Sequence, residues 1–138
     1  MVRADFNRQL MISIHNSVGS LSEVTNAISA YGINFVAICA YAVGNQVAIM
    51  FVTEDNNEAK RLLEEKGFIV NEEEVILLSI DNKPGALQLV TNHLAEAGID
   101  LRLIYGSVEK ESPLSRIIMI ADDNLEAMMI IKTLIERT

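Results

Sequence analysis

The sequence predicts an α+β protein built from two βαββαβ repeats, each with an antiparallel sheet and helices on one face. Three observations lead to this fold. At an offset of 66 residues (85 − 19), segments 13–35 and 79–101 agree at 10 of 23 positions; chance would match roughly one or two. Apolar runs alternate with amphipathic segments that end at glycine. The composition is aliphatic, with 50% hydrophobic but only 5% aromatic residues.

The first repeat opens with an apolar strand at residues 10–14 that runs into a turn at residues 15–19. A helix follows, because Ser20 and Glu23 have the spacing of a capping box. Gly32 ends this helix, since glycine readily adopts the left-handed conformation of a helix C-terminus. The apolar stripe expected to face the core consists of Leu21, Val24, Ile28 and Tyr31.

The rest of the first repeat reads as a hairpin followed by a second helix. Residues 35–43 and 46–53 are apolar strands joined by a Gly-Asn dipeptide, which suits a tight turn. Polar capping residues then introduce a helix at 57–66. We expect a short closing strand at 68–70 and, at 71–74, an acidic connector exposed to solvent.

The second repeat has the same order but lacks an evident last strand. The place of this strand could be filled by residues 1–9 or by an edge from another segment, or the sheet could stay one strand short. More than half of the surface of its last helix is apolar, so this helix needs cover on more than one side, and a subunit interface is one source. The expected elements are strand 75–80, loop 81–85, helix 86–97, strands 101–108 and 116–121, and helix 125–137.

This order of elements is that of the ferredoxin-like split βαβ arrangement. We divide the chain into repeats at residues 1–72 and 73–138. A domain of roughly 60 residues buries only about 60% of its unfolded surface. We therefore expect the repeats to pack together and the protein to form a homodimer.

The charge and the composition exclude several classes of function. A net charge of −8 repels nucleic acids and anionic membranes. The single cysteine, Cys39, excludes an intramolecular disulfide and multi-cysteine zinc sites. No apolar run approaches the roughly 20 residues that span a bilayer, so we expect a cytoplasmic protein. The two histidines occupy unrelated positions in the repeats, and we expect no catalytic residue, metal or cofactor.

The two turns from strand to helix are the candidate binding sites. A helix N-terminus presents free N–H groups and a positive dipole that can hold a carboxylate. An asparagine in each turn could bind an ammonium or amide group, and a glycine would allow close approach. The alternative is that these residues only build the turn. The candidate residues are Asn16, Ser17, Val18 and Gly19, and Asn82, Lys83, Pro84, Gly85, Ala86 and Leu87.

The segment Ile-Asp-Asn-Lys-Pro-Gly-Ala-Leu at 80–87, followed by segments 90–94 and 97–101, resembles the ACT domain. This family of small regulatory modules recurs in enzymes of amino-acid metabolism. The first repeat resembles a diverged copy, with Val18 where the family usually has proline. The resemblance implies a βαββαβ fold, side-by-side pairing of modules, and amino-acid effectors held at the interface between modules.

The resemblance also implies particular site residues. In the serine-sensing modules of phosphoglycerate dehydrogenases, contacts come from the Asn before Pro-Gly and from the Asn after the helix-ending glycine. The matching residues are Asn82 and Asp100 in the second repeat and Asn16 and Asn34 in the first. An isoleucine stands where those modules have a histidine, which argues against serine, and the Asp100 carboxylate could favour a ligand ammonium.

We therefore expect a stand-alone regulatory protein that binds a small amino-acid effector between modules. It would transmit binding through oligomerisation or through a partner such as a metabolic enzyme. The alternative is an interaction subunit that pairs with an enzyme and binds no ligand. A small enzyme or metal-binding protein of the same fold is the third hypothesis, and no catalytic constellation in the sequence supports it.

Overall fold

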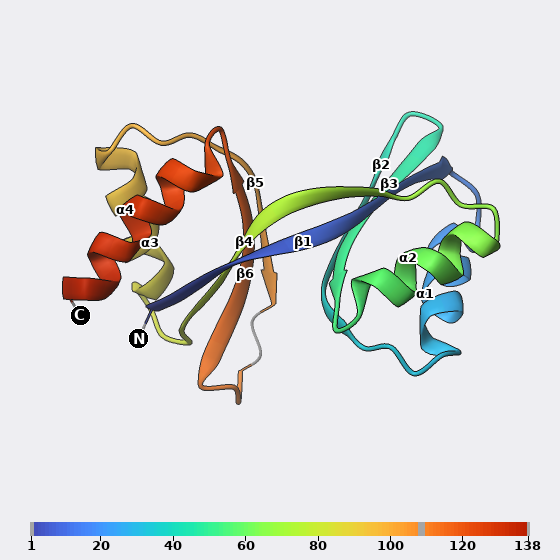
Figure 1. Ribbon diagram of the computed structural model, residues 1–138, viewed down its shortest axis with the longest axis horizontal. Helices are drawn as coiled ribbons and strands as arrows, with labels where there is room; N and C mark the ends of the chain where they lie inside the picture. The colour runs from blue at the N-terminus through green and yellow to red at the C-terminus, as the bar shows by residue number, and fades with distance from the viewer. Residues whose placement is uncertain (1, 108–109, 138) are drawn as a thin grey trace. The chain divides into compact units, whose positions relative to one another are not determined.

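The computed structural model describes residues 2–107 and 110–137. The chain divides into two compact units, which we call the first unit (Arg8–Glu73) and the second unit (residues 1–7 and 74–138) (Figure 1). Strand β1 and strand β4 contribute residues to both units. No helix within the described ranges is long and apolar enough to cross a membrane.

The first unit has two helices on one face of an antiparallel sheet, as Figure 1 shows. Its strands follow the order β2-β3-β1, and Ile49 of β3 pairs with Ile12 on one side and Ala40 on the other. Its core is aliphatic around one aromatic ring, Phe51. Its elements are β1 (Val2–His15, from Arg8 onward), α1 (Ser20–Ser29), β2 (Phe35–Val43), β3 (Gln46–Thr53), α2 (Asn56–Glu65) and the start of β4.

The second unit repeats this architecture with the strand order β1-β4-β6-β5. Ile76 and Leu78 of β4 pair with Met119 and Ile117 of β6, and all four side chains are buried in one cluster. The predicted α+β class and the two βαββαβ repeats are thus confirmed. The elements are β4 (Asn71–Asp81), α3 (Ala86–Glu96), β5 (Leu101–Ser107), β6 (Leu114–Ala121) and α4 (Asn124–Arg137).

The beginning of the chain provides the outer strand of the second unit. The sequence left open what fills this place, and residues 2–7 of β1 fill it beside β4. Val2 is 9% exposed and belongs to the core of the second unit, and Ala4 packs against the same core. This alternation of inward apolar residues is what a half-buried strand needs. The expected division at 72/73 assigned these residues to the first repeat, whereas the structure places them in the second unit.

Each unit secures the start of its second helix with the same asparagine contacts. Asn56 Oδ1 accepts the backbone N–H of Thr53 at 2.9 Å, and Asn56 Nδ2 donates to the carbonyl of Arg8 at 2.8 Å. One side chain therefore ties β3, α2 and β1 together. Asn124 repeats both bonds, with the N–H of Ala121 at 2.8 Å and the carbonyl of Glu74 at 3.1 Å.

The expected capping box at the start of α1 is wrong. The N-cap is Gly19, and it forms no side-chain cap. Ser20 is buried instead, with its Oγ 2.9 Å from the carbonyl oxygen of His15 and 2.8 Å from that of Ser17. The predicted stripe also holds only in part, because Leu21 is 41% exposed and Tyr31 is 59% exposed.

The expected short strand at 68–70 and the solvent-exposed acidic connector at 71–74 are also wrong. Residues 68–70 carry no strand, and β4 begins at Asn71, inside the acidic run. Glu72 is held by two cations, with the Nε of Arg8 at 2.8 Å and the Nζ of Lys60 at 3.3 Å. These contacts let an acidic segment continue as a strand.

Candidate functional site

Both helices that follow a candidate turn begin after a glycine in the left-handed conformation. Gly19 has φ 90° and Gly85 has φ 87°. A Cβ at either position would meet nothing within 4 Å, so the requirement for glycine is conformational and not steric. The turn thus needs these glycines whether or not a ligand approaches.

The backbone of each turn is anchored to the neighbouring hairpin. The N–H of Asn16 donates to the carbonyl of Asn45 at 2.7 Å, and the N–H of Asn82 donates to that of Pro113 at 3.0 Å. The first hairpin has a two-residue connection at Gly44-Asn45, whereas β5 and β6 are joined by a longer one. This difference in length decides what each asparagine side chain can contact.

A cavity of about 400 Å³ lies at the first turn. This volume falls within the usual range of small-molecule sites, roughly 300–1,000 Å³. Of the residues predicted to bind a ligand at this turn, Asn16, Ser17 and Gly19 line the cavity, whereas Val18 is fully exposed and is not among the lining residues. The other lining residues are Ser20, Leu21, Ser22, Ala40, Tyr41, Ala42 and Val47.

Several polar groups at this cavity are unused. Among the described residues, the backbone N–H groups of Leu21 and Ser22 have no acceptor, because the bonds of α1 begin with Glu23 donating to Gly19 at 3.0 Å. The side chain of Asn16 likewise has no hydrogen bond within the described ranges. The N-terminal end of α1, with its free amides and the positive end of its dipole, therefore lies at a cavity that Asn16 also lines.

The asparagine of the second turn is used inside the protein. Asn82 Nδ2 donates to the carbonyl of Ser112 at 2.9 Å, and its Oδ1 lies 3.4 Å from the Oγ of Ser115. Ser112 belongs to the segment that leads from β5 to β6, and Ser115 lies near the start of β6. Within the described residues, the side chain of the repeated asparagine is thus hydrogen-bonded at the second turn and not at the first.

The other predicted residues of the second turn divide into exposed and packed groups. Lys83, Pro84 and Gly85 are exposed, and Lys83 Nζ lies 3.8 Å from Asp81. Ala86 and Leu87 are half-buried and pack against the core of the second unit. Helix packing therefore accounts for these last two residues without a ligand.

Asn34 and Asp100 lie at the far ends of their helices from the turns. The backbone N–H of Glu54 donates to the backbone carbonyl of Asn34 at 3.1 Å. The backbone N–H of Asp122 donates to the backbone carbonyl of Asp100 at 3.1 Å. Helix α1 has ten residues, so it separates Asn16 from Asn34 by about 15 Å. The structure of a single unit does not bring the two predicted contact positions together.

Sequence reasoning missed the walls that β2 and β3 give to the first cavity. Leu21 was expected in the core, and nothing in the sequence marked Ala40, Tyr41 or Ala42. A signal was nevertheless present. The strand order of a βαββαβ unit places the third strand beside the first, which brings the hairpin of 35–53 next to the turn after β1.

Comparison with known proteins adds a family and several similar structures. A family model described as an ACT domain pair matches residues 6–134. Protein BT0572 from Bacteroides thetaiotaomicron is 25% identical, with a TM-score of 0.86, over 94% of this chain and 89% of that one. The regulatory subunit of aspartate kinase from Thermus thermophilus is 18% identical, with a TM-score of 0.66, over 96% and 95%.

The corresponding subunit from Thermus flavus is 20% identical, with a TM-score of 0.59, over 91% of this chain and 90% of that one. At these identities the two Thermus structures show a shared fold. The comparison with curated proteins gives no match.

Proposed function

The chain belongs to the ACT domain pair family, and from this premise we propose that it is a regulatory protein that binds a free amino acid at the first turn. One observation carries the proposal: Asn16, Leu21 and Ser22 line the same cavity, and among the described residues the N–H groups of Leu21 and Ser22 and the carboxamide of Asn16 have no hydrogen bond. The proposal assigns no catalytic step to the chain.

The cavity supplies a partner for each part of a zwitterion. The N–H groups of Leu21 and Ser22, at the positive end of the α1 dipole, would donate to the carboxylate. The carboxamide oxygen of Asn16 would accept a hydrogen bond from the ammonium. Strand β2 is the outer strand of its sheet, so one edge of its backbone has no neighbouring strand in the described sheet. The Tyr41 ring, which is 49% exposed, would contact the effector's side chain.

The second turn has a structural role in this proposal. Because Asn82 already bonds Ser112, an effector there would have to displace an internal hydrogen bond. Such a displacement reduces affinity, since the freed carbonyl must find another donor. We therefore place the effector contact in the first repeat.

Binding regulates only if the effector prefers one of two states. We propose that these states differ in association, either of two copies of this chain or of this chain with a metabolic enzyme. The names of the two Thermus relatives, regulatory subunits of aspartate kinase, support an enzyme partner. A protein that only pairs with an enzyme and binds no effector is the competing function.

A thermal-shift panel of the twenty amino acids tests the proposal. At about a hundred times Kd, a ligand stabilises the folded protein by about 2.7 kcal/mol, which raises Tm by several degrees. We expect one amino acid, or one small chemical group of them, to give this shift. Asn16→Ala should abolish the shift, and Asn82→Ala should retain it.

The control in this panel is built into the chain, because Asn82 occupies the repeat-equivalent position of Asn16. A shift that disappears equally in both variants would place the effector elsewhere. A flat panel with the unmodified protein would favour the competing interaction role.

A further inference from the structure

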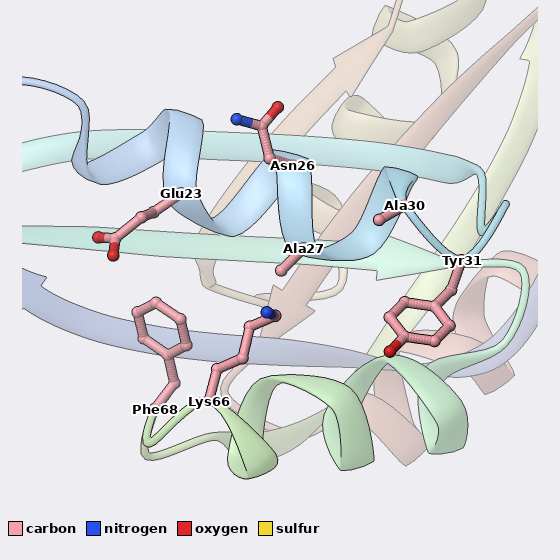
Figure 2. Close-up of a pocket in the computed structure, with 7 residues that line it drawn as sticks. All are labelled: Glu23, Asn26, Ala27, Ala30, Tyr31, Lys66 and Phe68. Atoms are coloured by element: carbon pink, nitrogen blue, oxygen red, sulfur yellow. The ribbon is translucent and has the colours of Figure 1, made fainter.

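A second cavity in the first unit lies on its helical face. It has a volume of about 720 Å³ and lies between α1 and the end of α2, on residues distinct from those of the first turn. Figure 2 shows it, with Ala27 and Ala30 on α1, Lys66 and Phe68 opposite, and Tyr31 and Glu23 toward its two sides.

The cavity combines apolar surfaces with one cation, that of the exposed Lys66. Ala27 is 5% exposed, and Phe68 packs against the core of the first unit. In Figure 2 the side chain of Lys66 extends toward Ala27, with the Phe68 ring on one side and the Tyr31 ring on the other. None of the ion pairs among the described residues includes Lys66, whereas Lys60 on the same helix is paired with Glu72.

The second repeat has a different arrangement at the equivalent place. His93 of α3 is the repeat equivalent of Ala27 (93 − 66 = 27), and its Nε2 lies 2.9 Å from the Oγ1 of Thr133 on α4. Helix α4 has 14 residues, whereas α2 has 10 and ends at Glu65. The first unit thus has a small residue and a shorter second helix where the second unit has this side-chain contact.

We propose that this cavity binds a small monocarboxylate with a flat apolar body, at a site independent of the amino-acid site at the first turn. Its carboxylate would pair with the Lys66 ammonium, and its body would lie on Ala27 and Ala30 between the rings of Phe68 and Tyr31. Glu23 at the rim would repel a second negative charge, so dicarboxylates would bind less well.

Phenylacetate is a suitable probe, and uncharged phenylacetamide of nearly the same shape is its control. Titration of the full chain, followed by NMR shifts of the Phe68 and Tyr31 rings, should show saturable binding of phenylacetate. Phenylacetamide and the dianion phenylsuccinate should bind at least several-fold more weakly. Lys66→Met keeps the length of the side chain and removes its charge, and it should weaken phenylacetate binding about tenfold.

Two further variants separate a specific site from general attraction to a lysine. Ala30→Trp places a large ring over the cavity from an exposed helix end and should abolish binding. Lys132→Met removes an exposed charge from α4 and should leave the affinity for phenylacetate unchanged. No saturable binding up to about 10 mM, equal binding of the amide, or an unchanged affinity in Lys66→Met would each overturn the proposal.

Discussion

Asn16 and Asn82 are the same residue type at the same repeat position, yet their surroundings give them different roles. The carboxamide of Asn82 donates to the carbonyl of Ser112, 2.9 Å from its Nδ2, whereas that of Asn16 has no hydrogen bond among the described residues. The sequence predicts an asparagine at both turns but does not show which one is occupied. That depends on how the connection from β5 to β6 folds back, and loop conformation has no periodic signal.

Stability measurements should show the same difference between the two side chains. Asn82→Ala removes the bond to Ser112 and leaves a half-buried carbonyl unpaired, so we expect it to lower the free energy of unfolding by about 1–2 kcal/mol. Asn16→Ala removes no described bond and should cost less than about 0.5 kcal/mol. Urea unfolding curves measure both values, and equal costs would contradict the assignment of Asn82 to a structural role.

At the scale of elements, Glu72 fastens the start of β4 to two other elements of the first unit. Arg8 belongs to β1 and Lys60 to α2, and both contact the Glu72 carboxylate. The hydrogen bonds from Arg8 and from Lys60 lower the pKa of Glu72 below its ordinary value of 4.5. The carboxylate is therefore favoured in the folded state.

Acid should weaken this junction. Because the pKa of Glu72 is lower in the folded than in the unfolded chain, its contribution is complete above about pH 4.5 and is lost as the pH falls through the folded value. Glu72→Gln should therefore be less stable than the unmodified protein near about pH 6 and lose less stability between about pH 6 and pH 3. Unfolding curves of both proteins at the two values of pH measure this, and an equal loss of unfolding free energy in both proteins would contradict it.

Much of the element order could be predicted from the sequence, because it rests on local patterns. The hairpin strands at 35–43 and 46–53 have the predicted bounds. The Gly-Asn turn between the two apolar runs marks the end of the first strand and the start of the second. The prediction failed at Ser20, whose hydroxyl contacts carbonyls of the preceding turn instead of capping the helix, and at 71–74, where contacts between distant segments decide. Ser20 bonds the His15 carbonyl at the end of β1, and Glu72 bonds a residue 64 positions away.

For the whole molecule, the defining feature is that β1 serves both units. Its residues from Arg8 onward belong to the first unit and residues 2–7 to the second. Residues 2–6 alternate Val-Arg-Ala-Asp-Phe, a strand pattern that can be recognised in the sequence. Which unit this half-strand completes could not be predicted, because pairing between distant segments leaves no local signal.

A single charge at the start of β1 should loosen the second unit. Val2→Asp would bury a carboxylate in the core that Val2 shares with β4, β6 and α4, and we expect a loss of about 2–4 kcal/mol. Hydrogen exchange should then speed up for the amides of β4 and β6. Arg3→Gln changes a neighbouring exposed side chain and should stay within about 0.5 kcal/mol. Unchanged protection of β4 and β6 in Val2→Asp would show that β1 does not complete this unit.

The split role of β1 also sets an order of events during translation. Residues 2–7 leave the ribosome before β4 and β6, which complete their surroundings and are synthesised about seventy to a hundred and twenty residues later. The nascent chain must therefore carry a half-strand with an open backbone edge until β4 and β6 have emerged. Closing so long a loop is slow, so we expect maturation of the protein to be limited by this last pairing step.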